Sequence, residues 1–113
     1  MTLEELRDQI DVLDRQLVEL LSERARAAIM VGHLKAETSL PVYEPVREKV
    51  VYANVRAANK GPLPDAELTH IYERIIDVMR ALQRNELASE RNARAVAPGP
   101  DSGARAPETG IKQ

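Results

Sequence analysis

The sequence predicts an all-α protein with three helices per chain, the first of them very long. Apolar residues recur every three or four positions in three segments, proline or glycine interrupts the chain between them, and no segment alternates apolar and polar residues as a strand does. The 113 residues suffice for one domain at most. With no Trp, no Phe and three Tyr, the core must be aliphatic and small. We therefore expect oligomerisation to add buried surface.

The first helix is expected to begin after Thr2 and to end near residues 38–41. Thr2 and Glu5 have the spacing of a capping box. The apolar stripe comprises Leu3, Leu6, Ile10, Leu13, Leu17, Leu20, Ala27, Val31 and Leu34. A helix of about 36 residues is roughly 54 Å long, whereas a compact domain of this size has a radius of gyration of roughly 13 Å. The chain cannot cover such a helix alone, so the sequence predicts a coiled coil or a helix shared between two protomers.

The second helix is expected from Pro45 to about Ala58. Proline is favoured in the first helical turn because it has no N–H to satisfy there. The run Asn-Lys-Gly-Pro-Leu-Pro at 59–64 then breaks the chain.

The third helix is expected to be capped by Asp65 and to end between Ala88 and Arg91. The residues that follow are mostly Pro, Gly, Ala, Ser and Arg, with few large apolar side chains. Such a composition cannot bury enough apolar surface to fold. We therefore expect a helical domain over residues 1–91 and a disordered tail over 92–113.

Composition excludes several classes of function. The net charge is −2, with basic and acidic residues interleaved, which argues against binding to nucleic acid or anionic lipid. No apolar stretch approaches the roughly 20 residues that span a bilayer, and no signal peptide is evident, so we expect a cytoplasmic protein. Without Cys or a cluster of metal-ligand residues, we expect the function to depend on charge, hydrogen bonding and shape.

Arg24 interrupts the apolar stripe of the first helix. Steps of seven residues from Leu3 pass through Ile10 and Leu17 and reach Arg24. A buried guanidinium without an anion costs several kcal/mol, so Arg24 requires either an internal acidic partner or a bound anion. Lys35 lies eleven residues on and projects from nearly the same side, about 16 Å along the axis. The two cations could therefore converge on one small anion.

Arg7 cannot join that pair within one chain. It lies about 25 Å from Arg24 along the helix and is rotated by roughly 100°. Arg7 can reach the same pocket only from a second protomer; otherwise it pairs with Asp11 or faces solvent.

Further polar residues are open to two interpretations. Glu44 could cap the second helix or reach a ligand, and Glu48 could pair with Arg47 or accept a ligand hydrogen bond. Gln83 lies beside the core stripe of the third helix, as an interface or a site residue. His33 is isolated and is assigned no function.

Together these positions resemble the all-helical, AroQ-type class of chorismate mutase over about residues 3–88. The matching residues are Leu6-Arg7, Ile10, Leu13-Asp14, Leu17, Ser22-Glu23-Arg24, Val31-Gly32-His33-Leu34-Lys35, the run 41–48, the break at 59–64, Ile75-Ile76 and Gln83. The resemblance implies an intertwined homodimer with two shared sites. It also implies rearrangement of chorismate to prephenate, in phenylalanine and tyrosine biosynthesis, with neither a cofactor nor a metal.

The resemblance assigns catalysis to Arg24, Lys35, Glu48 and Gln83. It adds as substrate-binding residues Arg7 of the second chain, Glu44 and Arg47. The two substrate carboxylates would bind Arg24 and Arg7. The ether oxygen would accept from Lys35 and Gln83. The ring hydroxyl would donate to Glu48, which Arg47 orients.

Two positions depart from the family's pattern. Glu44 stands where Asp is common, and Met79 stands where a small hydroxyl residue is frequent. Because Met cannot donate that hydrogen bond, we leave Met79 out of the site. Its neighbour Arg80 could supply a replacement cation.

Other functions stay open at this point. An isochorismate pyruvate lyase has the same fold and a similar cationic pocket. A helical dimer without catalytic activity could instead regulate another enzyme of the shikimate pathway. Residues 44–48 and 60–62 also resemble the version of the family that is fused to the first enzyme of that pathway.

Overall fold

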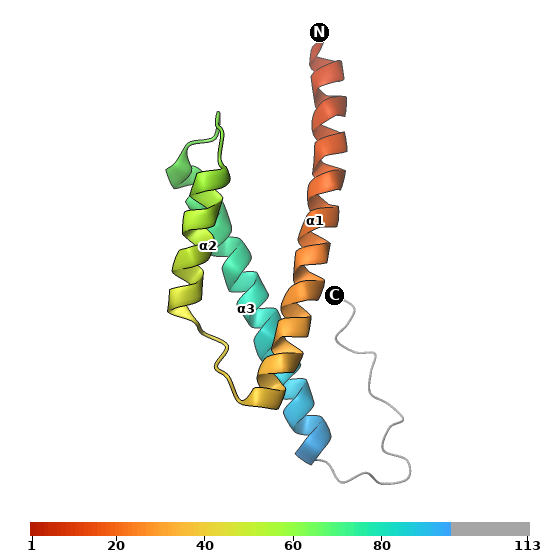
Figure 1. Cartoon of the computed structure of the whole chain (residues 1–113). Helices are drawn as coiled ribbons and strands as arrows, with labels where there is room; N and C mark the ends of the chain where they lie inside the picture. The colour runs from red at the N-terminus through yellow and green to blue at the C-terminus, as the bar shows by residue number, and fades with distance from the viewer. Residues whose placement is uncertain (96–113) are drawn as a thin grey trace, which may run out of the picture.

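The computed structural model describes residues 1–95, which form three α-helices and no strand (Figure 1). The helices are α1 (Leu3–Thr38), α2 (Pro45–Ala58) and α3 (Asp65–Ala95). The predicted all-α class is confirmed, as is the very long first helix.

The ends of α1 follow the residues that predicted them. The Glu5 backbone N–H donates to the Thr2 hydroxyl at 3.1 Å, and the Thr2 N–H donates to the Glu5 carboxylate at 2.8 Å. This is the predicted capping box. At the other end Ser39 adopts a left-handed conformation with φ of 62°, which terminates the helix.

The start of α3 differs from the prediction. Asp65 is the first residue of the helix, and Pro64 precedes it, with its carbonyl accepting from the Leu68 N–H at 3.0 Å. The Asp65 carboxylate instead accepts from the Asn59 side-chain amide at 2.7 Å. The same amide donates to the Leu63 carbonyl at 2.8 Å, so Asn59 organises the whole turn.

The end of α3 also differs. The helix continues through Ala95, four residues beyond the predicted limit at Arg91, so residues 92–95 of the predicted tail are helical. The rest of that tail, residues 96–113, lies outside the described residues.

The three helices pack unequally. The C-terminal half of α1 crosses α3, and α2 packs along α3 (Figure 1). Gly32 lies at the α1–α3 crossing, where a Cβ atom would come within 3.2 Å of the Glu86 Cβ and 3.3 Å of the Gln83 Cα. The close approach of the two helices thus favours glycine, since a Cβ would force the neighbouring atoms to shift by a few tenths of an ångström. The small core near this crossing includes Ala28, Ile76 and Met79.

The N-terminal half of α1 projects away from α2 and α3 (Figure 1). Its apolar stripe is 43–63% exposed at Leu3, Leu6, Ile10, Leu13, Leu17 and Leu20. The radius of gyration is 18.7 Å, well above the roughly 13 Å of a compact domain of this length. Residues 1–95 contain no helix with the length and apolar character needed to cross a membrane.

Candidate active site

A cavity of ≈ 520 Å³ is lined by residues of all three helices and of the loop between α1 and α2. Its polar lining consists of Arg24, Lys35, Glu44, Arg47, Glu48, Arg80 and Gln83. Its apolar lining consists of Ala27, Ala28, Val31, Val42, Val51, Ile76 and Met79. Of the predicted site residues, all except Arg7 line this cavity.

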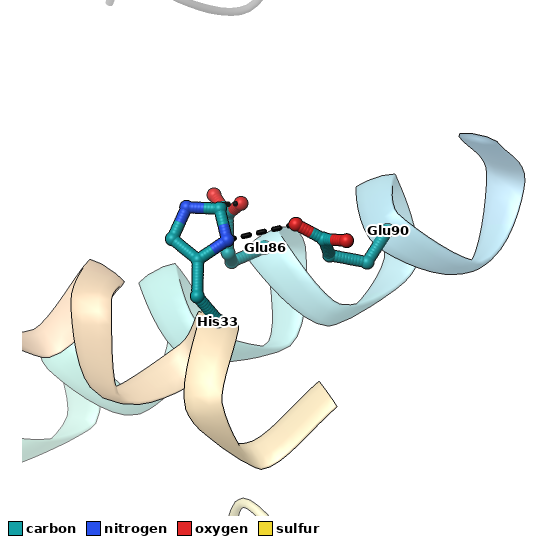
Figure 2. A group of neighbouring side chains, drawn as sticks. All are labelled: His33, Glu86 and Glu90. Carbon is teal, nitrogen blue, oxygen red and sulfur yellow. Dashed lines mark hydrogen bonds and ion pairs between the residues drawn. The ribbon is translucent and has the colours of Figure 1, made fainter. Parts of the chain in front are cut away.

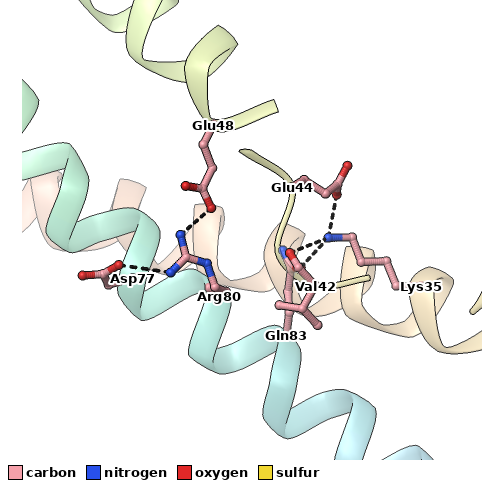
Figure 3. Close-up of polar contacts among 7 residues, drawn as sticks. All are labelled: Lys35, Val42, Glu44, Glu48, Asp77, Arg80 and Gln83. Carbon is pink, nitrogen blue, oxygen red and sulfur yellow. Dashed lines mark hydrogen bonds and ion pairs between the residues drawn. The ribbon is translucent and has the colours of Figure 1, made fainter. Parts of the chain in front are cut away.

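Lys35 is the buried cation of the cavity, with 5% of its surface exposed. Its ammonium group contacts the Glu44 carboxylate at 2.6 Å, the Gln83 side-chain oxygen at 3.0 Å and the Val42 carbonyl at 3.1 Å (Figure 3). An ammonium group has three donors, so every one has an acceptor. These contacts offset the cost of burying the charge and orient Lys35 and Gln83 toward each other.

Arg24 has no acidic partner within residues 1–95. Its guanidinium carbon lies 6.0 Å from the centroid of the Tyr72 ring, which orients the cation without neutralising it. Of the two interpretations of Arg24, the internal ion pair is therefore not observed. The guanidinium is available to an anion in the cavity.

Glu48 pairs with Arg80 of α3 and not with Arg47, its neighbour on α2 (Figure 3). Arg80 also donates to Asp77 at 3.3 Å. Arg47 is exposed and forms no ion pair among the described residues. Consecutive residues of a helix point about 100° apart, so Arg47 and Glu48 do not face each other. Of the two interpretations of Glu48, the pair with Arg47 is therefore not observed.

The charge of Arg80 is permanent. The hydrogen bond to Glu48 raises the pKa of the Arg80 guanidinium above its ordinary value, although desolvation opposes this. Counted over its lining, the cavity holds four cations, Arg24, Lys35, Arg47 and Arg80, against two carboxylates, Glu44 and Glu48. The excess of positive charge suits a small molecule with two negative charges.

The sequence pattern of chorismate mutase type II matches residues 6–84. This chain belongs to the chorismate mutase type II family. Among curated relatives, the bifunctional chorismate mutase/prephenate dehydratase of Aquifex aeolicus is 36% identical over 73% of this chain and 24% of its own length. The chain thus spans about a quarter of that bifunctional protein. The chorismate mutase of Methanocaldococcus jannaschii is 31% identical over 80% of this chain and 92% of its own length.

Solved chorismate mutases share the fold. The Thermus thermophilus enzyme (Form II) is 34% identical, with a TM-score of 0.70 over 72% of this chain and 92% of that one. The Helicobacter pylori enzyme, solved in complex with prephenate, is 31% identical, with a TM-score of 0.70 over 76% of this chain and 93% of that one. The predicted resemblance to the helical chorismate mutases is confirmed.

Two residues of this family member differ from the sequence-based interpretation of its site. Met79, left out of the predicted site, is buried and lines the cavity. Arg80, mentioned only as a replacement cation, contacts the predicted site residue Glu48 directly. A sequence signal for Arg80 exists, since it lies three residues before Gln83 and shares a helix face with it.

His33, assigned no function from the sequence, belongs to a polar cluster outside the cavity (Figure 2). Its Nδ1 lies 2.7 Å from the Glu90 carboxylate and its Nε2 lies 2.9 Å from that of Glu86. These three residues carry metal-ligand atoms within 4.8 Å of one another. Each carboxylate faces a different ring nitrogen, so the cluster does not present both acids and one ring nitrogen to a single shared ion.

Proposed function

We propose that this chain converts chorismate to prephenate by a concerted Claisen rearrangement, without a covalent intermediate, a cofactor or a metal. The observation that carries the proposal is the cationic cavity of a member of the chorismate mutase type II family. Lys35 is buried in it, and Arg24 lines it without an acidic partner among residues 1–95. One carboxylate of a dicarboxylate ligand in this cavity would pair with the Arg24 guanidinium.

The chemistry requires conformational restriction and a suitable electrostatic field. Chorismate must be held in a chair-like conformer while negative charge develops on the ether oxygen as the carbon–oxygen bond breaks. Donors fixed in advance near that oxygen stabilise the transition state more than the ground state. We assign this role to the Lys35 ammonium group and the Gln83 side-chain NH2 group. The Lys35 Nζ already lies 3.0 Å from the Gln83 Oε1. Since every Lys35 donor is occupied, the ether oxygen must displace one internal acceptor of Lys35.

The remaining roles concern substrate binding. Arg24 binds one carboxylate, Arg47 supports the carboxylate end, and Glu48 accepts from the ring hydroxyl. Glu44 contacts Lys35 in this structure and lies close enough to the cavity to meet the substrate. The second carboxylate needs a further cation, which we assign to Arg7 of a second copy.

An intertwined homodimer supplies that copy. Arg7 lies on the exposed half of α1, about 25 Å along the axis from Arg24. The exposed apolar stripe around it is the surface that an antiparallel or crossing α1 of a second chain would cover. We propose that each of two sites is completed by Arg7 of the other protomer.

The proposal also covers the bounds of the catalytic module, its location in the cell and its partner proteins. We expect the catalytic module within residues 1–91 and a cytoplasmic location. The bifunctional relatives carry a prephenate dehydratase in the same protein. We therefore expect this chain to associate with another enzyme of the shikimate pathway, and co-purification tests this expectation.

The deciding experiment is incubation of the purified protein with chorismate and, separately, with isochorismate. Proton NMR distinguishes the products even where substrate and product have equal mass. Prephenate from chorismate is the expected result. Pyruvate with salicylate from isochorismate alone indicates the lyase, and turnover of neither substrate indicates a regulatory dimer without catalytic activity.

A further inference from the structure

The side chain of Arg80 connects the parts of the site that come from α2 and α3. One terminal nitrogen donates to Glu48 of α2 and the other to Asp77 of α3 (Figure 3). The guanidinium carbon also lies 5.2 Å from the centroid of the Tyr43 ring, in the loop before α2. The side chain is 22% exposed. Arg80 is therefore held from three directions at the wall of the cavity.

Glu48 has one oxygen engaged and one free. Its Oε2 accepts from Arg80, whereas Oε1 has no hydrogen-bond partner among the residues that the structure describes. A carboxylate held through one oxygen has fewer rotamers available to the other. Arg80 thus leaves one fixed acceptor at the cavity wall, where a ligand hydroxyl can donate.

The packing of α2 makes this contact important. No residue of α2 is fully buried, and among the described residues α2 packs on α3 alone. Apolar contacts therefore fix α2 weakly, and the Arg80–Glu48 pair is a polar connection between the two helices. The Nε atom of Arg80 is buried and has no hydrogen-bond partner among the residues that the structure describes.

We propose that Arg80 is a positioning residue that orients Glu48 for the ring hydroxyl of the substrate, the role that the family resemblance assigned to Arg47. This inference rests on the proposed chorismate mutase activity. Arg80 acts through Glu48, so its loss should matter only while Glu48 is present. A cation that contacted the substrate independently would behave differently.

The test is a double-mutant cycle in the full chain, with Arg80→Met, Glu48→Gln and the double variant, each measured for kcat and KM with chorismate. We expect Arg80→Met to lower kcat/KM by about 10²-fold, the scale of a misplaced catalytic group, with much of the loss in kcat. The double variant should be no worse than Glu48→Gln. Arg80→Lys should recover part of the loss because it keeps the charge.

Arg74→Met is the matched control, since Arg74 is an exposed arginine of the same helix that does not line the cavity. It should leave kcat/KM unchanged. Losses that multiply in the double variant would overturn the proposal in favour of direct contact with the substrate. Unchanged kcat and KM in Arg80→Met would overturn it as well.

A second readout separates this inference from the proposed activity. Denaturant unfolding of the wild type, Arg80→Met, Glu48→Gln and the double variant measures the coupling free energy between Arg80 and Glu48 without any substrate. If the wild-type chain turned over no chorismate, the proposed function would fail, and Arg80 as a positioning residue would fail with it. Unfolding that still showed coupling would then assign the pair a purely structural role.

Discussion

Arg24 and Lys35 lie on the same helix and line the same cavity, yet their surroundings differ. Lys35 is buried with three acceptors, whereas Arg24 has an aromatic ring and no acid among residues 1–95. Removing Lys35 leaves its three acceptors without the donor that they share. Removing Arg24 leaves no carboxylate of residues 1–95 without its cation.

The two alanine variants should therefore separate activity from stability. Both Arg24→Ala and Lys35→Ala should lower kcat/KM by about 10²–10³-fold through lost electrostatic stabilisation. Only Lys35→Ala should also lower the free energy of unfolding, by about 1–3 kcal/mol, because Glu44 and Gln83 lose a buried partner. Enzyme kinetics and denaturant unfolding measure the two effects.

Arg26→Ala is the control for this pair, because Arg26 is an exposed arginine on the same helix and does not line the cavity. It should leave both activity and stability unchanged. Near-normal turnover in Arg24→Ala or in Lys35→Ala would refute their assignment to the site.

At the scale of elements, the crossing of α1 and α3 determines the distance between Lys35 and Gln83. Gly32 allows that crossing, because the nearest atoms to a Cβ there include the Gln83 backbone, which cannot rotate away. Glycine costs a helix interior roughly 1 kcal/mol relative to alanine. A glycine here is thus explained by packing.

Gly32→Ala should separate α1 from α3. We expect kcat/KM to fall by about 10-fold or more, since small displacements of catalytic groups are costly. The gain of roughly 1 kcal/mol in helix propensity should be offset by the strain of the crossing. A variant with full activity and a higher melting temperature would show that the crossing tolerates a Cβ.

The last helix supports a prediction about chain length. All cavity residues and the His33–Glu86–Glu90 cluster lie before Arg91. A chain that ends at Ala95 should therefore keep the kcat/KM of the full chain, and one that ends at Arg91 should lose at most a little stability from the shorter helix. A large loss of turnover in the chain ending at Ala95 would show that residues 96–113 contribute to the site.

For the whole molecule, a second copy of the chain would account for two features of α1. One is the exposed apolar stripe, and the other is the distance between Arg7 and the cavity. Apolar residues at this spacing, about half exposed along a helix, are expected to be covered by another helix. Light scattering should give a dimer.

Mixed dimers test the shared site. Arg7→Ala and Lys35→Ala protomers should each be nearly inactive alone. When mixed in equal amounts and allowed to exchange, they should recover roughly a quarter of wild-type activity, because half of the dimers hold one intact site. If mass spectrometry proves subunit exchange and no activity returns, Arg7 does not complete the site of another protomer.

Features that depend on helical geometry within one element could be predicted from the sequence alone. The capping box, the ends of α1 and α2, the exposed stripe and the common side of Arg24 and Lys35 all follow from a fixed rotation and rise per residue. The faces through which the helices meet could not be predicted in this way and are known from the packed structure. Glu48 meets Arg80 rather than Arg47, and His33 meets two acids 53 and 57 residues away, because contacts between helices depend on crossing angles and distances that periodicity does not encode.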